Sequence, residues 1–297
     1  MTADTASSGF DMAENIFRAS APAKVNLSLR VLRRRDDGFH ELETRMVPIS
    51  LCDQIELQLR RSGGLELSCD DPTLPLGEDN LATRAVRVFE GETGRAVDAR
   101  ISMQKRIPSG AGLGGGSSDA AAVLRLLDVA LGTKLGTQRL AEIAAEIGSD
   151  VPFFLFGQAC DASGRGERIV PVDFPHELQL LLIKPPFGVS TPWAYGRWRD
   201  SVQNAAFPYA SQSLPFGELV NDLERPVFEK HLVLGDLKRW LMEQPETSAA
   251  LMSGSGATVF AVMAKDADGG ALASRARAEF GATFWTQLVE TLPSPEE

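Results

Sequence analysis

Apolar and polar residues alternate along much of the first part of the chain, a pattern that predicts strands. The alternation covers residues 16–19, 22–32, 45–60 and 64–68, with Arg-Asp-Asp-Gly and Ser-Gly-Gly turns between segments. From Asn80 to Glu90 the apolar residues recur instead at helical spacing. We therefore expect this part of the chain to mix strands and helices.

Two further helices are predicted in the middle of the chain. The first runs from Ser118 to Leu131 and is ended by Gly132. Thr137 is predicted to cap the second, which then carries one apolar stripe before Gly148. The stripe consists of Leu140, Ile143, Ala144 and Ile147. Asp150 falls just after the expected end of this helix, where it caps a following helix or takes part in chemistry.

The second half of the chain has a βαβ-like order of elements. Two apolar strands and several helices are expected after residue 165, followed by a strand at 258–264, a helix at 268–279 and a strand at 283–288. A chain of 297 residues with 43% hydrophobic content can bury one large core or two moderate ones. Two closely packed domains are therefore the natural expectation.

Charge and cysteine content limit the possible partners. The formal net charge is −10, which disfavours bulk nucleic-acid binding, so we expect no nucleic-acid partner. An anionic ligand would rely on local donors such as Lys24, Lys105 and Arg106. The three cysteines lack metal-ligand spacing, and neither a leader nor an apolar run near the roughly 20 residues of a spanning helix is present. A cytoplasmic protein without membrane contact is expected.

A glycine-rich segment is the strongest chemical signal in the chain. Five glycines and two serines lie between Gly110 and Ser118, directly before an alanine-rich helical pattern. Glycine lets successive N–H groups turn toward an anion, and the first turn of the helix adds its own unpaired donors. The alternative, a simple tight turn before a helix, would carry so many glycines at an entropic cost with no evident gain. This segment is predicted to bind nucleotide phosphates.

Spacing separates the known phosphate-binding patterns. The segment is not a Walker A loop, because no Lys-Ser or Lys-Thr follows the glycines. A dinucleotide-binding G-x-G-x-x-G fits Gly110, Gly112 and Gly115, yet the residues around it lack the expected buried strand and the later acid. The longer pattern P-x-G-x-G-L-G-x-S-S-[ADN]-A fits residues 108–120 apart from one additional glycine. On this pattern the chain resembles the GHMP kinase superfamily.

Other segments extend the resemblance in family order. They are 21–27, 37–42, 78–81, 147–154, 164–167 and 253–257. They resemble the branch of the superfamily that phosphorylates a cytidine diphosphate-linked methylerythritol, a small-molecule substrate of isoprenoid precursor biosynthesis. One departure is Phe39, because the branch usually has tyrosine there. The aromatic face is kept and a phenol hydroxyl is lost.

The resemblance implies a fold and its division into domains. It implies an α+β GHMP kinase fold with an amino-terminal ribosomal-protein-S5-like α/β domain at 16–165 and a carboxyl-terminal ferredoxin-like domain at 166–290. Residues 1–15 and 291–297 are expected to be flexible termini.

The resemblance also implies ATP and Mg²⁺ as cofactors and gives roles to particular residues. Lys24 and Asp150 would be catalytic. The ATP phosphates would be held by Pro108, Ser109, Gly110, Ala111, Gly112, Leu113, Gly114, Gly115, Gly116, Ser117 and Ser118. The substrate would be held by Asn26, Phe39, His40, Tyr195, Ser253 and Gly254.

Simpler interpretations of these residues stay open from sequence alone. Strand alternation puts Lys24 and Asn26 on one face, which suits a solvent-facing strand edge as well as a site. Phe39 and His40 suit a hairpin with a surface histidine, and 253–256 suits a plain turn. At the level of function the alternatives are another GHMP small-molecule kinase, a dinucleotide-dependent oxidoreductase and an inert nucleotide-binding module.

Overall fold

The computed structural model describes residues 15–294, and the chain forms two compact units. The first consists of the chain up to Pro22, Cys52–Arg106 and Gly115–Phe156. The second consists of Ala23–Leu51, Ile107–Gly114 and the chain from Gly157 onward. Each unit combines helices with strands, which confirms the predicted α+β class. The domain division near residue 165 stays a prediction.

The ends of the chain were expected to be flexible. Residues 1–14 and 295–297, on which most of that prediction falls, lie outside the described residues. Inside the described part, Thr291 is buried and forms an antiparallel bridge with Ile49. The final strand therefore leads directly into a structured contact.

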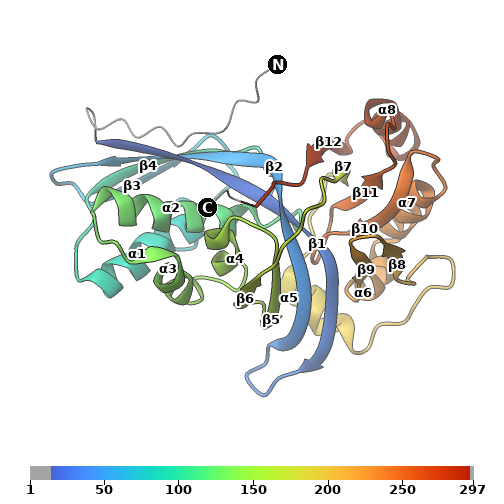
Figure 1. Ribbon diagram of the computed structural model, residues 1–297, viewed down its shortest axis with the longest axis horizontal. Coiled ribbons are helices and arrows are strands. Elements are labelled where there is room, and N and C mark those ends of the chain that lie inside the picture. Colours follow the sequence, from blue (N-terminus) through green and yellow to red (C-terminus); the bar gives the residue numbers. More distant parts are fainter. Residues whose placement is uncertain (1–14, 295–297) are drawn as a thin grey trace. The chain divides into compact units, whose positions relative to one another are not determined.

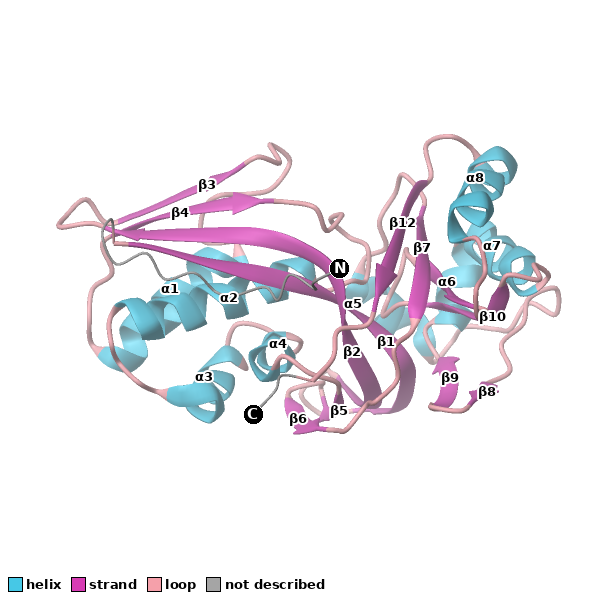
Figure 2. Cartoon of the chain, turned by 45° about the horizontal axis from the view of Figure 1, so that its top comes forward, coloured by secondary structure: helices cyan, strands magenta, loops and turns pink. Residues whose placement is uncertain are grey.

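The first unit contains a mixed sheet and a layer of helices. Its strands are β3 (Leu65–Cys69), β4 (Ala99–Gln104) and parts of two long strands, β1 (Ile16–Arg34) and β2 (His40–Leu59), whose residues 23–34 and 40–51 belong to the second unit. Their order is β3-β4-β2-β1, with β3 parallel and β2 antiparallel to β4. The helices are α1 (Leu81–Thr93), α2 (Gly115–Ala130), α3 (Gly136–Ala144) and α4 (Val151–Phe156). In Figure 2 the α1 and α2 helices lie along one face of the β3-β4-β2 strands.

The predicted start of α1 is confirmed by its cap. The Asn80 side chain accepts a hydrogen bond of 2.9 Å from the Ala82 N–H, which satisfies one of the free donors of the first turn. The helix ends at Gly94, whose φ of 66° is the left-handed conformation typical of a C-terminal glycine.

Two local predictions need correction. The predicted strands at 16–19 and 22–32 form one continuous strand, β1, because an extended backbone accommodates the fixed φ of Pro22. The predicted cap at Thr137 is wrong, since α3 begins at Gly136 after Leu135 and has no side-chain cap bond. Asp128 organises this connection instead, accepting hydrogen bonds from the Leu135 N–H at 2.8 Å and the Thr133 hydroxyl at 2.5 Å.

The second unit is built around an antiparallel sheet of order β10-β11-β7-β12. Its strands are β5 (Cys160–Gly164), β6 (Arg168–Pro171), β7 (Gln179–Lys184), β8 (Gln212–Leu214), β9 (Gly217–Asn221), β10 (Thr247–Met252), β11 (Val259–Met263) and β12 (Trp285–Glu290). Its helices are α5 (Thr191–Trp198), α6 (Glu224–Lys230), α7 (Leu232–Met242) and α8 (Gly269–Phe280). Figure 1 shows α7 and α8 beside this sheet. Within the same unit β5 pairs with β2, and β9 runs parallel to β1.

Both faces of the central strand β7 are buried. Leu181 and Ile183 join a core cluster with side chains of α6, α7 and α8, such as Leu237. Leu180 and Leu182 join a second cluster that includes residues of β1. Because successive side chains point to opposite faces, a strand between two cores must be apolar at every position. This explains the uninterrupted apolar run seen in the sequence.

Two helical glycines test this packing. A Cβ atom at Gly235 of α7 would lie 2.6 Å from the Phe207 ring, whereas one at Gly91 of α1 would meet nothing within 4 Å. We expect Gly235→Ala to destabilise the protein by about 1–3 kcal/mol through overpacking. Gly91→Ala should be neutral or stabilising by up to about 1 kcal/mol, because alanine favours the helix. Urea unfolding midpoints measure both, and equal midpoints would contradict the packing of Phe207.

Candidate active site

The glycine-rich loop, residues 107–114 of the second unit, docks through its carbonyl groups. The carbonyls of Gly110, Ala111 and Leu113 accept hydrogen bonds from the N–H groups of Ala257 (3.4 Å), Thr258 (3.2 Å) and Lys24 (3.0 Å), respectively. Gly110, Gly112 and Gly114 have φ of 62°, 75° and 75°, which only glycine adopts readily. With these carbonyls used inside the protein, their dipoles are not available to repel a bound anion.

Gly112 marks the closest approach between the loop and the turn that follows β10. A Cβ atom there would lie 2.2 Å from the Ser253 carbonyl oxygen, so no other residue fits. The Gly112 carbonyl accepts hydrogen bonds from the Ser253 hydroxyl at 3.0 Å and from Lys24 Nζ at 3.1 Å. The loop, the turn and β1 therefore meet at one carbonyl group.

Lys24 and Asn26 point inward from β1. Each is 3% exposed, so the alternative of a solvent-facing strand edge is wrong. Lys24 Nζ donates to Asn26 Oδ1 at 2.6 Å, and Asn26 Nδ2 donates to Thr44 Oγ1 at 2.8 Å. A Cβ atom on Gly254 would lie 3.2 Å from Lys24 Nζ, so the turn places backbone against the ammonium group. Sequence analysis did not identify Thr44. It lies in β2, the strand next to β1 in the sheet, which is consistent with this contact.

The turn between β1 and β2 carries the predicted aromatic residues. Gly38 has a φ of 86°, and the Arg35 N–H donates to the Phe39 carbonyl at 2.8 Å, which closes the hairpin. Phe39 is 49% exposed, with the Arg165 guanidinium carbon 4.7 Å from its ring centroid. The Phe39 ring is thus presented at the surface with a cation on one of its faces.

His40 is buried, contrary to the simpler expectation of a surface histidine. Its ring centroid lies 5.5 Å from that of Tyr195 and 6.0 Å from that of Trp198. Burial, assisted by the charge of Arg34, lowers the pKa of His40 below its ordinary value, which keeps the imidazole neutral at neutral pH. A neutral imidazole has one donor and one acceptor, which suits recognition of a polar heterocycle edge. Sequence analysis did not identify Trp198 because its role depends on how α5 packs.

The first unit holds the other predicted site residues. Gly115, Gly116, Ser117 and Ser118 form the first turn of α2, which begins three residues before its predicted start. Ser118 is buried, and its hydroxyl has no hydrogen-bond partner among the described residues. Asp150 lies in the turn directly before α4. Because Lys24 belongs to the second unit, the pairing of Asp150 with Lys24 stays a prediction.

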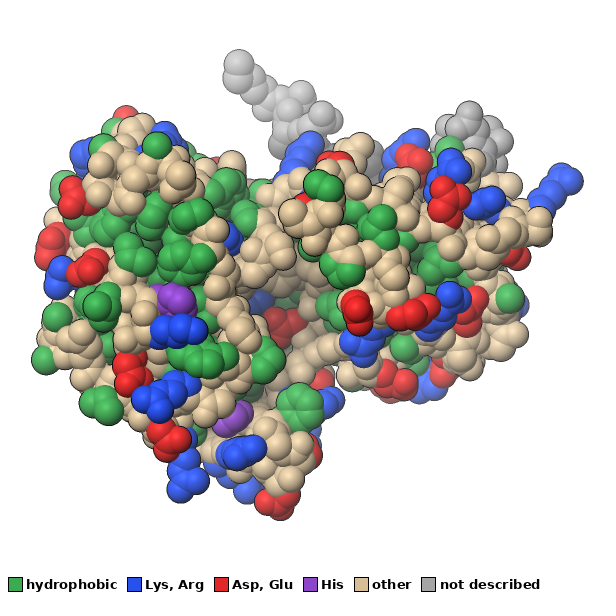
Figure 3. Space-filling model, turned by 180° about the vertical axis from the view of Figure 1, so that it is seen from behind, with side chains coloured by type: hydrophobic (Ala, Val, Ile, Leu, Met, Phe, Trp, Pro, Cys, Tyr) green, Lys and Arg blue, Asp and Glu red, His purple; other side chains and the backbone are tan. Residues whose placement is uncertain are grey.

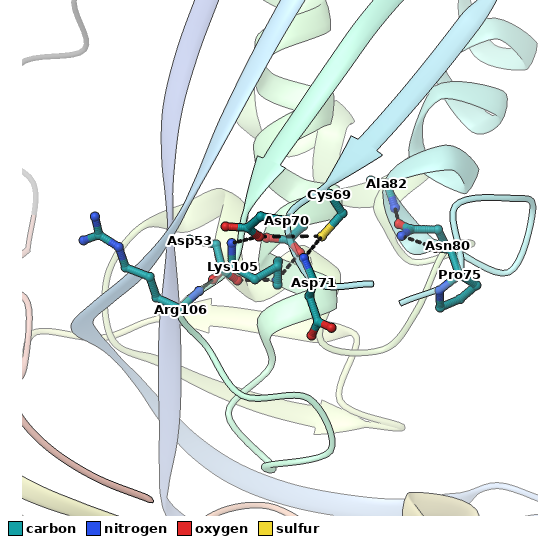
Figure 4. A network of polar contacts seen from close by, with 10 residues as sticks. Asp53, Cys69, Asp70, Asp71, Pro75, Asn80, Ala82, Lys105 and Arg106 are labelled. Atoms are coloured by element: carbon teal, nitrogen blue, oxygen red, sulfur yellow. Dashed lines mark hydrogen bonds and ion pairs between the residues drawn. The ribbon is translucent and has the colours of Figure 1, made fainter. Parts of the chain in front are cut away.

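Asp53, Lys105 and Asp119 form a buried ionic group. Lys105 precedes the glycine-rich loop in the sequence and Asp119 follows it. Lys105 Nζ bonds to both Asp53 and Asp119, and Asp53 also accepts the Arg106 N–H at 2.5 Å. Figure 4 shows Lys105 and Arg106 beside Asp53, with Asp70 accepting the Lys105 N–H at 2.8 Å. Burial raises the pKa of Asp119 to about 7, with Lys105 opposing the shift. The ammonium group of Lys105 is thus committed to carboxylates, which corrects its expected role as a donor to an anionic ligand.

Comparisons with known proteins agree with this geometry. The family models for the GHMP kinases N terminal domain and GHMP kinases C terminal match residues 80–158 and 210–282. The 4-diphosphocytidyl-2-C-methyl-D-erythritol kinase of Methylacidiphilum infernorum is 42% identical over 94% of this chain and 98% of its own length. The chain belongs to the 4-diphosphocytidyl-2-C-methyl-D-erythritol kinase family of GHMP kinases.

Further members of this kinase family give the same result. The kinase of the same name from Geobacter metallireducens is 40% identical, over 83% of this chain and 89% of its own length. A crystal structure of 4-(cytidine 5'-diphospho)-2C-methyl-D-erythritol kinase has a TM-score of 0.70 and 35% identity, and the match covers 92% of this chain and 99% of that one. Homoserine kinase from Cytophaga hutchinsonii, at 18% identity and a TM-score of 0.68 over 96% of this chain and 97% of its own, shares the fold.

Family membership confirms the predicted two-domain GHMP kinase fold and a small-molecule kinase that uses ATP. It sets aside the dinucleotide-dependent oxidoreductase and the inert nucleotide-binding module. The particular residues predicted to hold ATP and substrate remain predictions that the geometry above now makes testable.

The contact at Gly112 generates a direct test of the loop. We expect Gly112→Ala to weaken ATP binding about tenfold or more, because its Cβ atom would force the loop away from Ser253. Gly132→Ala is the matched control, since Gly132 has a similar φ of 61° and a Cβ atom there meets nothing within 4 Å. Titration with a non-hydrolysable ATP analogue measures both variants. Equal affinities would count against the loop as the phosphate site.

Proposed function

We propose that this chain phosphorylates the 2-hydroxyl of 4-diphosphocytidyl-2-C-methyl-D-erythritol with ATP, yielding ADP and the 2-phosphate, in non-mevalonate isoprenoid precursor biosynthesis. Its relatives carry the name of this kinase over nearly the whole chain. The observation that most supports the chemistry is the buried Lys24 ammonium held against the carbonyl of Gly112 in the glycine-rich loop.

The glycine-rich segment 108–118 holds the ATP phosphates in this proposal. Its support is the left-handed backbone of Gly110, Gly112 and Gly114, together with carbonyl groups that are already bonded within the protein. The first turn of α2 follows directly in the chain and supplies further N–H donors and the positive end of the helix dipole.

Mg²⁺ fits this site as a companion of ATP. Among the described residues no three His, Cys, Asp or Glu side chains form a metal-binding group, and Mg²⁺ is usually held by substrate phosphates with only one or two side chains. Ser118, whose buried hydroxyl lacks a partner among the described residues, is the side chain that fits as a ligand. When bound, the ion supplies neutralisation of phosphate charge.

Two side chains carry the proton transfer and charge stabilisation. Asp150 accepts the proton of the attacking hydroxyl as general base, and Lys24 orients that hydroxyl and stabilises developing negative charge. Asn26 keeps the Lys24 ammonium in place through its Oδ1 atom, with the 2.6 Å bond described above. Phosphoryl transfer requires little covalent chemistry from the protein, so the main contribution of the protein is to position the reactants.

The cytidine end of the substrate is held by the β1–β2 hairpin and α5. Phe39 and Tyr195 offer aromatic faces for stacking, and neutral His40 reads the polar edge of the base. Asn26 and the turn residues Ser253 and Gly254 complete the substrate side. Its support is that Asn26 and Gly254 lie against Lys24, and that Ser253 bonds the same Gly112 carbonyl as Lys24.

The proposed cellular setting follows from charge and thiols. Cys69 and Cys160 are free thiols, which fits a cytoplasmic enzyme. No helix within residues 15–294 is long and apolar enough to cross a membrane. The formal net charge of −10 gives little attraction for nucleic acid, and Lys and Arg side chains are interspersed with Asp and Glu on the face seen in Figure 3.

The role of Asp150 is tested by Asp150→Asn, which keeps the size of the side chain and removes its basicity. We expect kcat to fall about 10²-fold or more while the affinity for ATP is retained, because a general base acts on the chemical step. Asp173→Asn, which changes an exposed carboxyl of the second unit, is the control and should keep parental kcat. Near-parental kcat in Asp150→Asn would leave Asp150 as a helix cap.

The cytidine site is tested by Phe39→Ala combined with His40→Ala. We expect KM to rise about tenfold or more for the cytidine substrate and to change little for ATP, because base stacking is worth about 1–3 kcal/mol. CDP should compete with the alcohol substrate of the parental enzyme and compete less in the double variant. Phe216→Ala with His176→Ala removes another aromatic pair of the same unit, with ring centroids 5.8 Å apart, and serves as the control. If CDP does not compete with the alcohol substrate of the parental enzyme, the cytidine-linked substrate is wrong. Only the broader assignment, a GHMP small-molecule kinase, then stands.

A further inference from the structure

The turn formed by residues 252–256 depends on polar groups that the proposed mechanism has not used. It connects β10 to β11 and carries Ser253, which bonds the Gly112 carbonyl. Gly254 and Gly256 have φ of 56° and 84°. A turn of this kind has no side-chain packing of its own at its glycines, so its position must be fixed from outside.

Asn221, the last residue of β9, fixes the turn through both hydrogens of its amide group. Asn221 Nδ2 donates to the Met252 carbonyl at 2.7 Å and to the Gly254 carbonyl at 2.8 Å. Asn221 Oδ1 accepts from the Leu223 N–H at 2.9 Å, which fixes the orientation of the amide. Asn221 is 4% exposed, so water does not readily replace these bonds.

A buried ion pair holds the same turn from a second direction. Glu224 Oε1 accepts the Met252 N–H at 2.9 Å, and Glu224 Oε2 bonds Lys238 Nζ at 2.6 Å. Each of the two charged side chains is 1% exposed. Met252, at the start of the turn, is thus bonded at both its N–H and its carbonyl by buried side chains.

The strand pairing links this support to the residues at the other side of the Gly112 carbonyl. Asn221 is opposite Leu29 of β1 in the parallel β1–β9 pair, and the same strand β1 carries Lys24. Lys24 and Ser253 both donate to the Gly112 carbonyl. Asn221 therefore bonds the turn that carries one of these donors, Ser253. Its own strand, β9, pairs with β1, the strand that carries the other donor, Lys24.

We propose that Asn221 is a positioning residue for phosphoryl transfer, which holds the 252–256 turn so that Ser253 and Lys24 bond the Gly112 carbonyl together. The inference rests on the proposed function of the glycine-rich loop and Lys24. Asparagine suits this role because two donors and one acceptor are needed at one short side chain. Aspartate would turn two donors into acceptors that face carbonyl oxygens.

The test compares Asn221→Ala with a matched side chain on β8, the strand that pairs with β9. Gln212 bonds both backbone groups of Ala250 in β10, with Nε2 to the carbonyl at 2.7 Å and Oε1 to the N–H at 3.0 Å. Gln212→Ala thus also removes two hydrogen bonds to backbone groups, but both belong to Ala250 of β10 and lie outside the turn. We expect kcat to fall about tenfold or more, up to roughly 10²-fold, in Asn221→Ala and to change less than about twofold in Gln212→Ala, with both variants less thermally stable than the parent.

A double-mutant cycle shows whether Asn221 acts through the turn. Ser253→Ala should lower kcat, and Asn221→Ala combined with Ser253→Ala should lose little more than Asn221→Ala alone, because both changes break the same contact. Independent losses that multiply in the double variant would overturn the proposal. So would an Asn221→Ala enzyme whose kcat matches that of Gln212→Ala. Asn221→Ser, which keeps one donor, takes the place of Asn221→Ala in every comparison if the alanine variant does not fold.

Lys24→Met separates this proposal from the one on which it rests. If Lys24→Met keeps parental kcat, the proposed role of Lys24 fails. If Lys24→Met abolishes turnover while Asn221→Ala behaves like Gln212→Ala, the proposed function stands and the inference about Asn221 is wrong.

Discussion

The carbonyl group of Gly112 is the point on which the candidate site depends. It receives one hydrogen bond from an ammonium group and one from a hydroxyl, at 3.1 Å and 3.0 Å. A buried lysine without such acceptors would lose its charge or its position, because desolvation penalises an isolated cation by several kcal/mol. The loop that is proposed to bind phosphate therefore also supplies an acceptor for the buried Lys24 side chain.

Lys24 of the second unit and Lys105 of the first unit are bonded to different kinds of acceptor. In the second unit Lys24 Nζ donates to two neutral oxygens, Asn26 Oδ1 and the Gly112 carbonyl. In the first unit the ammonium group of Lys105 forms ion pairs with the side chains of Asp53 and Asp119. The bonds of Lys105 thus join Asp53 of β2 to Asp119 of α2 within the first unit.

Sequence reasoning was most successful where a local constraint acts on consecutive residues. The glycines of the loop, the helix that begins near Asn80 and the turn at Gly38 each follow from rules that a short segment must obey. The Thr137 cap failed because Asp128, in the preceding helix, satisfies the connection instead. A local rule is overridden when a side chain elsewhere supplies the same hydrogen bond.

The residues that sequence reasoning missed act across long separations. Thr44 supports Asn26 from a neighbouring strand, and Trp198 contacts His40 from a helix far along the chain. Asn221 resembles any asparagine at a strand end until the turn that it bonds is known. Their side chains carry no periodicity or motif, because their function is defined only by the tertiary pairing of strands.

The bond between Ser253 and Gly112 joins residues that lie 141 positions apart in the sequence. Contacts of such long separation form late, because the loss of chain entropy precedes the gain from the contact. During synthesis the glycine-rich segment leaves the ribosome long before β10 and β11 exist. A nascent chain that ends before residue 253 lacks the turn that contacts this side of the loop, so the loop reaches its native arrangement only after residues 253–258 have been synthesised.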